Sequence, residues 1–402
     1  MAKKEYDVIV VGAGPGGSTC AAFLGQKGYN VLLLDKAKFP RDKTCGDAIS
    51  GSLKTQERLN LTPAVERNSH AKVNGVIFSS PKGDVLEIPF KGTGYVCRRY
   101  IYDNLIFQKA KSSGIDVIQE FTVTDLIQEA GYVKGIRGNT YKGDEVEIRS
   151  KIVVGADGAH SIVARKTGSI DHDAKHTITS VRAYYKNVGG VKPAIELHFV
   201  DDILPGYFWI FPVDKNSANV GLGMVVEDFK KKNWKMTDKM FEIIANNPMF
   251  KDRFKDAKLE KGTVKGWTLP VGSKRRNAHG NGYVLVGDAA ALIDPFTGEG
   301  IANSMKSGEI ASNWIEKAIK TNNFSAEFLK QYEDGVWEVL GKKLRTSYKL
   351  QKMGKKKFLT NLVVGKAAKS KQIQDTLRQM LDNTEERKKL ANPLFYLKLL
   401  FG

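Results

Sequence analysis

The sequence predicts a mixed α/β chain, α+β overall, in which a Rossmann-like nucleotide-binding domain is interleaved with an antiparallel-sheet domain and followed by a helical C-terminal region. Three observations predict this fold class. A short β-branched strand near the N-terminus ends in a glycine-rich turn, and far downstream a second strand ends in Gly-Asp before more glycines. Short strand-like stretches dominate between about residues 175 and 270, and helical sequence dominates after that.

The N-terminal unit has the order of elements of a dinucleotide site. Residues 8–11 form the strand, and Gly12, Gly14 and Gly17 match G-x-G-x-x-G. The first glycine permits a tight turn, the second lets the backbone approach a pyrophosphate, and the third lets the next helix pack closely. Asp35 ends the following strand, where a carboxylate would accept hydrogen bonds from a ribose hydroxyl. An ordinary glycine-rich turn is the alternative, and this order of elements disfavours it.

Two later segments predict that the dinucleotide is FAD, and hence an oxidoreductase. The strand 152–154 breaks into Asp157 and Gly158, which would flank the dinucleotide, although Asp157 could simply cap the next helix. The other segment places Asp288 after the strand 283–286, where its carboxylate could bind ribityl or pyrophosphate-side groups. A helix N-terminus at the flavin pyrimidine edge would favour the anionic reduced flavin by about 0.3–2 kcal/mol, and a plain loop is the alternative. The residues that would form this N-terminus are Gly298, Gly300 and Ile301.

These motifs, in this order, resemble the FAD-binding fold of the p-hydroxybenzoate hydroxylase group. Within that group, residues 40–46 (PRDKTCG) are similar to the P-x-x-K-x-C-G segment of the geranylgeranyl reductase family. Residues 207–212 (YFWIFP), followed by Gly221 and Gly223, resemble the Y-x-W-x-F-P…G-x-G substrate-cavity motif of the same family. Arg99 begins an R-x-x-[FY]-D segment of the wider flavoprotein group, which makes it a candidate flavin contact.

The resemblance implies an FAD-dependent reductase that saturates isolated double bonds of a polyprenyl (geranylgeranyl) chain in lipid or isoprenoid biosynthesis. Hydride would leave flavin N5, and water or a nearby acid would supply the proton. Cys45 is the expected catalytic residue, near the flavin together with Lys43 and Gly46, and a buried inert thiol is the alternative. Cations at the cavity mouth would suit a phosphate head, but the sequence does not identify them. The expected substrate-binding residues are Tyr207, Trp209, Phe211, Pro212, Gly221 and Gly223.

Three other functions are compatible with the same motifs. A flavin monooxygenase would share the fold but consume O₂. A flavin-dependent halogenase is suggested by Trp209-Ile-Phe-Pro212, which partly matches W-x-W-x-I-P, but residue 207 is Tyr rather than Trp. A membrane-docked electron carrier would bind FAD without turning over an alkene. Because no second Rossmann motif is evident, the expected electron donor is ferredoxin, another reductase or transiently bound NAD(P)H.

Composition narrows the partners and the compartment. Three cysteines without paired spacing argue against a disulfide framework and for a reducing compartment. The N-terminus has no apolar signal region, and no apolar run approaches the roughly 20 residues of a spanning helix. We expect a cytoplasmic protein that binds no metal and no nucleic acid, because no nucleic-acid motif accompanies the net charge of +19.

The positive charge is concentrated at the C-terminus. Residues 341–402 contain 16 Lys and Arg but only 4 Asp and Glu, and they finish with the apolar, aromatic residues 393–401. Such a segment would attract the protein to the anionic inner face of a membrane, at about 1 kcal/mol per well-placed cation. A solvated helical tail whose apolar end packs on the enzyme is the alternative.

The expected domain organisation is discontinuous. Residues 1–70, 98–172 and 272–335 would form the FAD-binding domain, and residues 71–97 and 173–271 the substrate-binding domain. Residues 336–402 would form the basic helical C-terminal region.

Overall fold

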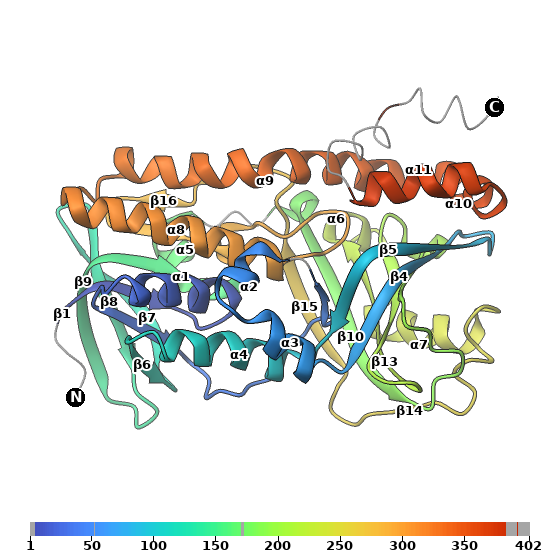
Figure 1. The fold of residues 1–402 in the computed structure, drawn as a ribbon, viewed down its shortest axis with the longest axis horizontal. Coiled ribbons are helices and arrows are strands. Elements are labelled where there is room, and N and C mark those ends of the chain that lie inside the picture. Colours follow the sequence, from blue (N-terminus) through green and yellow to red (C-terminus); the bar gives the residue numbers. More distant parts are fainter. Residues whose placement is uncertain (1–4, 52, 170–172, 383–391, 393–402) are drawn as a thin grey trace.

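The computed structural model describes residues 5–51, 53–169, 173–382 and 392. Two β-sheets lie end to end in an elongated molecule, and long helices run along one side of both (Figure 1). We call the sheet at the end that holds the N-terminus sheet A and the other one sheet B.

Sheet A contains the N-terminal strand at its centre, and its main strand order is β16-β17-β9-β1-β2-β6. Strand β1 is almost entirely buried because its Val and Ile side chains are covered on both faces, and it pairs in parallel with β2 and β9. Strand β8 pairs antiparallel with both β7 and β9. The strands are β1 (Glu5–Val11), β2 (Val31–Asp35), β6 (Asp116–Gln119), β7 (Thr122–Glu129), β8 (Tyr132–Asn139), β9 (Glu145–Gly155), β16 (His279–Gly280) and β17 (Tyr283–Leu285).

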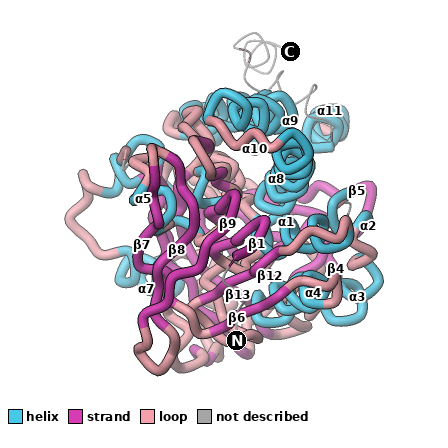
Figure 2. Tube along the Cα trace, turned by 90° about the vertical axis from the view of Figure 1, so that its left-hand side faces the viewer, coloured by secondary structure: helices cyan, strands magenta, loops and turns pink. Residues whose placement is uncertain are grey.

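Helices cover one side of sheet A. Helix α1 follows the glycine-rich turn and packs between α4 and α8, and α9 packs on α8 (Figure 2). This arrangement places the N-terminus of α1 at the carboxyl ends of β1 and β9, where dinucleotides bind in open α/β sheets. The helices are α1 (Pro15–Gln26), α4 (Arg99–Lys111), α8 (Ile301–Thr321) and α9 (Ala326–Gly354).

Sheet B is mainly antiparallel, as the sequence predicts, but β11 pairs with β4 in parallel. Its main order is β14-β10-β13-β12-β11-β4-β5-β3, and β15 pairs with the same edge of β10 as β14 does. The strands are β3 (Ala48–Ser50), β4 (Ala71–Ser79), β5 (Val85–Val96), β10 (Thr177–Lys186), β11 (Ile195–His198), β12 (Tyr207–Pro212), β13 (Ser217–Val225), β14 (Lys258–Leu259) and β15 (Lys265–Pro270).

The remaining helices lie outside the helix layer on sheet A or contribute only short turns to it. Helix α7 packs on β10 and β13, and α10 and α11 pack on β5. They are α2 (Lys54–Arg58), α3 (Thr62–Asn68), α5 (Ile162–Lys166), α6 (Val226–Phe229), α7 (Met236–Asn246), α10 (Lys357–Lys369) and α11 (Lys371–Asp382), with 3₁₀ turns at Gly158–His160, Ala174–His176, Asp201–Ile203 and Gly287–Ala290.

The described part of the C-terminal region is attached to the body of the protein. Val364 and Ala367 of α10 and Leu377 of α11 form one buried cluster with apolar side chains of β4 and β5. These contacts hold α10 and α11 against sheet B. The basic run 387–389 and the apolar end 393–401 lie outside the described residues.

One expected domain boundary falls inside a continuous helix, and one strand pairs outside the domain expected for it. Helix α9 runs unbroken through the boundary at residue 336, because its apolar face packs continuously on its neighbours. Strand β3, which was assigned to the nucleotide-binding part, pairs with β5 in sheet B. The segment that carries Cys45 therefore leads directly from one sheet to the other, and the domain division itself stays a prediction.

Candidate active site

A cavity of about 1800 Å³ lies where the two sheets meet. A pocket for one small ligand usually measures about 300–1000 Å³, so this cavity has room for a dinucleotide and a second molecule. Four of the predicted site residues do not line it: Gly17, Pro212, Gly221 and Gly223. Those that do are Gly12, Gly14, Asp35, Lys43, Cys45, Gly46, Arg99, Asp157, Gly158, Tyr207, Trp209, Phe211, Asp288, Gly298, Gly300 and Ile301.

The three glycines of the N-terminal turn act in different ways. Gly12 has a φ of +100°, and a Cβ there would lie 2.5 Å from the Ala156 carbonyl oxygen. A Cβ on Gly17 would lie 1.9 Å from the Gly12 oxygen, so Gly17 serves helix–strand packing without lining the cavity. A Cβ on Gly14 would meet, in the described part of the chain, only Arg41 Nη2 at 3.8 Å. This open cradle at the start of α1 fits a pyrophosphate.

Two of the predicted carboxylates are held by backbone N–H groups. Each oxygen of Asp35 accepts one such bond, from Ala13 N and Ala37 N, both at 2.8 Å. Its remaining lone pairs are available to a ribose. Asp157 instead accepts from Ile162 N at 2.6 Å and from Ser161 Oγ at 2.5 Å, so its carboxylate holds the first turn of α5, whose N-cap residue is Ser161. The Asp157 carboxylate therefore contacts the start of a helix, and the residue also lines the cavity.

Arg99 belongs to a buried group of charges. Its guanidinium donates two hydrogen bonds to Asp103, at 2.6 and 2.8 Å, and Arg41 Nη1 donates to the same carboxylate at 2.7 Å. Burial alone would lower the pKa of Arg99, but Asp103 and the Cys45 thiol beside it raise that pKa well above its usual value. Arg41 lies next to Gly14, and sequence reasoning missed it as a candidate pyrophosphate contact because only the fold brings the two together.

The loop 294–300, which contains Gly298 and Gly300 and precedes α8, is held by hydrogen bonds from several elements. Asp294 accepts from the backbone N–H groups of Phe296 and Thr297, both at 2.9 Å, and from Ser347 Oγ of α9 at 2.7 Å. Tyr207 Oη donates to the Thr297 carbonyl at 2.6 Å. The C-terminal helix α9 therefore helps position the expected flavin edge, which the sequence did not indicate.

Cys45 is held through a buried polar network. Asn219 donates to the Cys45 carbonyl and to Asp47 Oδ2, both at 2.8 Å, and accepts from Trp209 Nε1 at 3.0 Å. Tyr184 also donates to Asp47 Oδ2, whereas Asp47 Oδ1 has no hydrogen-bond partner among the described residues. Burial raises the pKa of Asp47 to about 6. Asn219 and Asp47 are site residues that the motif match did not identify.

The register of β12 and β13 explains the second family-like motif. Tyr207 lies opposite Gly223, and Trp209 lies opposite Gly221. A Cβ on Gly221 would lie 2.4 Å from the Trp209 ring, and one on Gly46 would lie 2.7 Å from the Phe211 ring. The glycines therefore make room for aromatic rings that line the cavity, which is why Gly221 does not line it itself.

Lys43 and Asp288 face the same interior. Burial and the neighbouring Arg99 lower the pKa of Lys43 to about 8, although Asp288 raises it in part. The Lys43 ammonium lies 3.9 Å from the centre of the Trp267 ring, a cation–π contact. Burial raises the pKa of Asp288, and Lys43 and Arg99 oppose that rise. Lys43 and Asp288 therefore each favour the charged form of the other.

Comparisons with known proteins agree with this geometry. The family of FAD binding domains matches residues 5–335. The digeranylgeranylglycerophospholipid reductase of Methanocella arvoryzae is 35% identical over 358 residues, which cover 87% of this chain and 88% of that protein. The enzyme of the same name from Methanocaldococcus jannaschii is 35% identical over 338 residues, which cover 82% of this chain and 81% of that protein.

Solved structures share the architecture. A geranylgeranyl bacteriochlorophyll reductase-like protein from Thermoplasma acidophilum superposes with a TM-score of 0.79 at 26% identity and covers 99% of this chain and 96% of its own. A flavin-dependent brominase superposes with a TM-score of 0.75 at 21% identity, over 95% of this chain and 100% of its own. At that identity the brominase shows only the common fold.

Proposed function

Because this chain belongs to the FAD-binding flavoproteins and, within them, to the digeranylgeranylglycerophospholipid reductase family, we propose that it saturates isolated double bonds of a geranylgeranyl chain carried by a polar lipid. It is an FAD-dependent oxidoreductase that acts on CH–CH groups. One observation carries the choice of substrate: the cavity continues from the dinucleotide motifs into an arm walled by apolar side chains. This apolar arm is lined by Val76, Phe78, Phe90, Ile195, Leu197 and Phe199.

The residues of this chain perform three tasks in the proposed reaction. When bound and reduced, FAD supplies the hydride. Trp209 and Phe211 hold the chain beside Cys45 and exclude water, so that positioning and low polarity account for much of the rate on an unactivated alkene. The proton comes from water or from a nearby acid. Asp47 is a suitable acid because a pKa of about 6 leaves part of it protonated near neutral pH.

The test is anaerobic. The purified holoenzyme is reduced with dithionite, polyprenyl lipids are added, and flavin reoxidation is followed together with the product mass. We expect reoxidation with a gain of two hydrogen atoms for each double bond saturated.

The same experiment discriminates among the other functions. No reoxidation by lipid, with rapid reoxidation by O₂ and a product that gains one oxygen atom, would favour a monooxygenase. If neither the lipid nor O₂ gave reoxidation with a product, an electron carrier would be favoured. Supplying ferredoxin, a reductase or NAD(P)H in place of dithionite then identifies the physiological donor.

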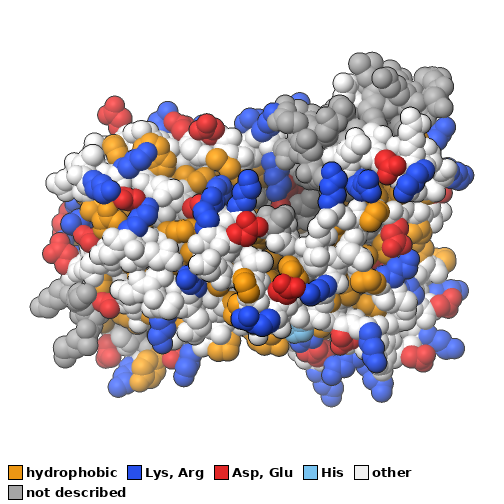
Figure 3. Space-filling view, viewed as in Figure 1, with side chains coloured by type: hydrophobic (Ala, Val, Ile, Leu, Met, Phe, Trp, Pro, Cys, Tyr) orange, Lys and Arg blue, Asp and Glu red, His pale blue; other side chains and the backbone are white. Residues whose placement is uncertain are grey.

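We also propose that the protein binds the surface of an anionic membrane through α10 and α11. Basic side chains gather over α10 and α11 (Figure 3), including the exposed Lys366, Lys369 and Lys371. Phe358 at the start of α10 is 60% exposed, which suits an interfacial contact. Within the described ranges, no helix combines the length and apolar character that crossing a bilayer requires.

Vesicle binding tests this surface. Replacing Lys366 and Lys369 by Gln is expected to weaken binding to phosphatidylglycerol vesicles by about thirtyfold, because each well-placed Lys contributes about 1 kcal/mol. The matched control replaces the exposed Lys251 and Lys255, which lie after α7 and away from α10. Equal binding of both double variants in a sedimentation assay would refute a role for α10.

A further inference from the structure

The face of sheet B that lines the cavity changes character along the sheet. Aliphatic and aromatic side chains of β4, β5 and β11 line one end, and Trp209 and Phe211 of β12 line the middle. At the other end, Ser180 and Arg182 of β10 lie opposite Trp267 and Lys265 of β15. We call this end the basic arm and define it by Ser180, Arg182, Lys265, Trp267 and Lys43.

The basic arm contains donors without acceptors. Arg182 is 1% exposed, and within the described chain its Nε atom is buried without a hydrogen-bond partner. Trp267 Nε1 is likewise buried and unpartnered as far as the structure describes the chain. Leaving a buried donor unsatisfied costs about 1–3 kcal/mol, so two such donors on residues that line one cavity arm favour an acceptor ligand there.

The charge of the basic arm indicates an anion. Lys43, Arg182 and Lys265 bring three cations to it, whereas Asp42 is the carboxylate that pairs with two of them. Lys265 Nζ lies 2.8 Å and Arg182 Nη2 lies 3.3 Å from Asp42. An anion placed among these groups would also oppose the depression of the Lys43 pKa. His160 packs edge-on against Trp267, with the ring centres 5.6 Å apart.

We infer that the basic arm binds a phosphate group, so that the cavity holds a polyprenyl chain at its apolar end and a phosphate at its basic end. None of the β10 and β15 residues belongs to the motifs assigned to the dinucleotide. A phosphate carried by the lipid head would lie on the opposite side of Cys45 from the apolar arm. Its position would set how far the polyprenyl chain reaches into that arm, and therefore which double bond lies near Cys45. A phosphate-bearing electron donor offers the same chemistry. The lipid form of this inference rests on the proposed function, whereas phosphate binding itself does not.

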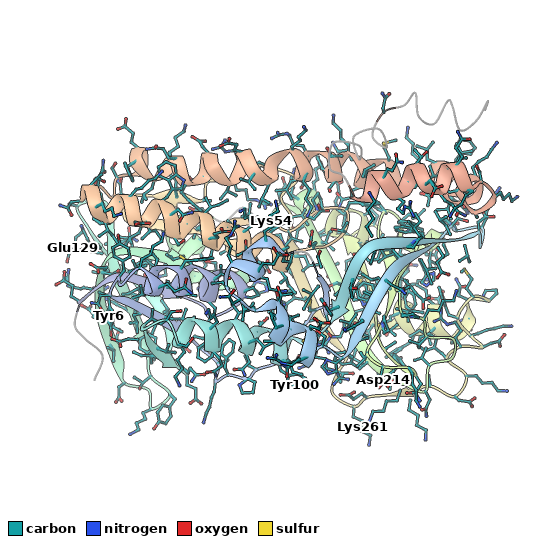
Figure 4. All side chains as sticks on the ribbon, in the orientation of Figure 1. Tyr6, Lys54, Tyr100, Glu129, Asp214 and Lys261 are labelled. Atoms are coloured by element: carbon teal, nitrogen blue, oxygen red, sulfur yellow. The ribbon has the colours of Figure 1, made fainter. Side chains whose placement is uncertain are left out.

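Two substitutions test the basic arm without leaving a large cavity in the buried interior. Lys265→Met removes an exposed cation at its rim, and Trp267→Phe removes the Nε1 donor but keeps an aromatic face for Lys43. Each is expected to weaken the binding of inorganic pyrophosphate to the FAD-loaded protein about tenfold, as measured by calorimetry, because each removes one donor to an anion. The matched control is Lys261→Met, an exposed lysine in the turn between β14 and β15 (Figure 4), which should bind pyrophosphate like the wild type.

Turnover driven by dithionite distinguishes the source of the phosphate. With geranylgeranyl diphosphate as substrate, both variants should raise KM about tenfold, while turnover of geranylgeraniol, which has the same chain without phosphate, stays unchanged. A defect confined to reduction by NADPH would assign the arm to the donor. Unchanged pyrophosphate binding, or equal losses with both lipids, would overturn the inference. If wild-type protein binds pyrophosphate but reduces neither lipid, the proposed function fails and the phosphate site stands.

Discussion

Replacing Cys45 by alanine is expected to leave FAD bound and to slow alkene reduction by about a hundredfold or more. Cys45 lines the cavity beside Arg99 and Gly46, and Asn219 fixes its backbone carbonyl from sheet B. A positioned proton-transfer group typically contributes about 10²–10⁴-fold, which sets the expected loss if the thiol assists protonation. The measurement is the rate of flavin reoxidation by a polyprenyl lipid in a single anaerobic turnover.

The matched control is Cys20→Ala. Cys20 is fully buried in α1, and burial raises the pKa of its thiol to about 12, so it offers no reactive group to the cavity. This variant should reduce alkenes at the wild-type rate. Full activity in Cys45→Ala, with FAD content equal to the wild type, would remove the thiol from the mechanism and leave Cys45 as a packing residue.

The dinucleotide unit could be predicted from sequence because its signals are local. A buried strand, a turn with a positive-φ glycine and a helix N-terminus follow one another between Glu5 and Gln26, and each is encoded by its own residues. The Tyr207-to-Gly223 motif could also be recognised, but its meaning depends on the pairing of β12 with β13. Only that register shows that Gly221 makes room for the Trp209 ring.

The rest of the candidate site depends on contacts between distant segments. Ser347 reaches Asp294 from a helix that the sequence assigned to a separate C-terminal region. Asn219 joins sheet B to the backbone of Cys45, 174 positions away in the chain. Neither residue carries a local signal, since a polar side chain on a strand or helix is usually solvated. Composition predicted a basic protein, but it could not place Arg182 and Lys265 at one end of the cavity.

Asp103 shows how strongly the site depends on such contacts. It is buried in α4 and accepts hydrogen bonds from both Arg99 and Arg41. Burial alone would raise the pKa of Asp103, but the two guanidinium groups lower it below its usual value. A carboxyl whose folded-state pKa is depressed stabilises the fold above its unfolded pKa of about 3.9. Its contribution is lost as the pH falls through the lower, folded-state value.

Replacing Asp103 by alanine is therefore expected to lower the free energy of unfolding by about 3–5 kcal/mol at neutral pH, because Arg99 is left buried without its partner. The difference between wild type and variant should shrink only in acid, as the wild-type carboxyl takes up its proton. Urea unfolding at a series of pH values measures both effects. Asp125→Ala is the control, since its exposed pair with Lys166 should contribute at most about 1 kcal/mol. If both variants lost equally little stability, the two arginines would not depend on Asp103, and the buried charge group would not be what holds Arg99 against the site.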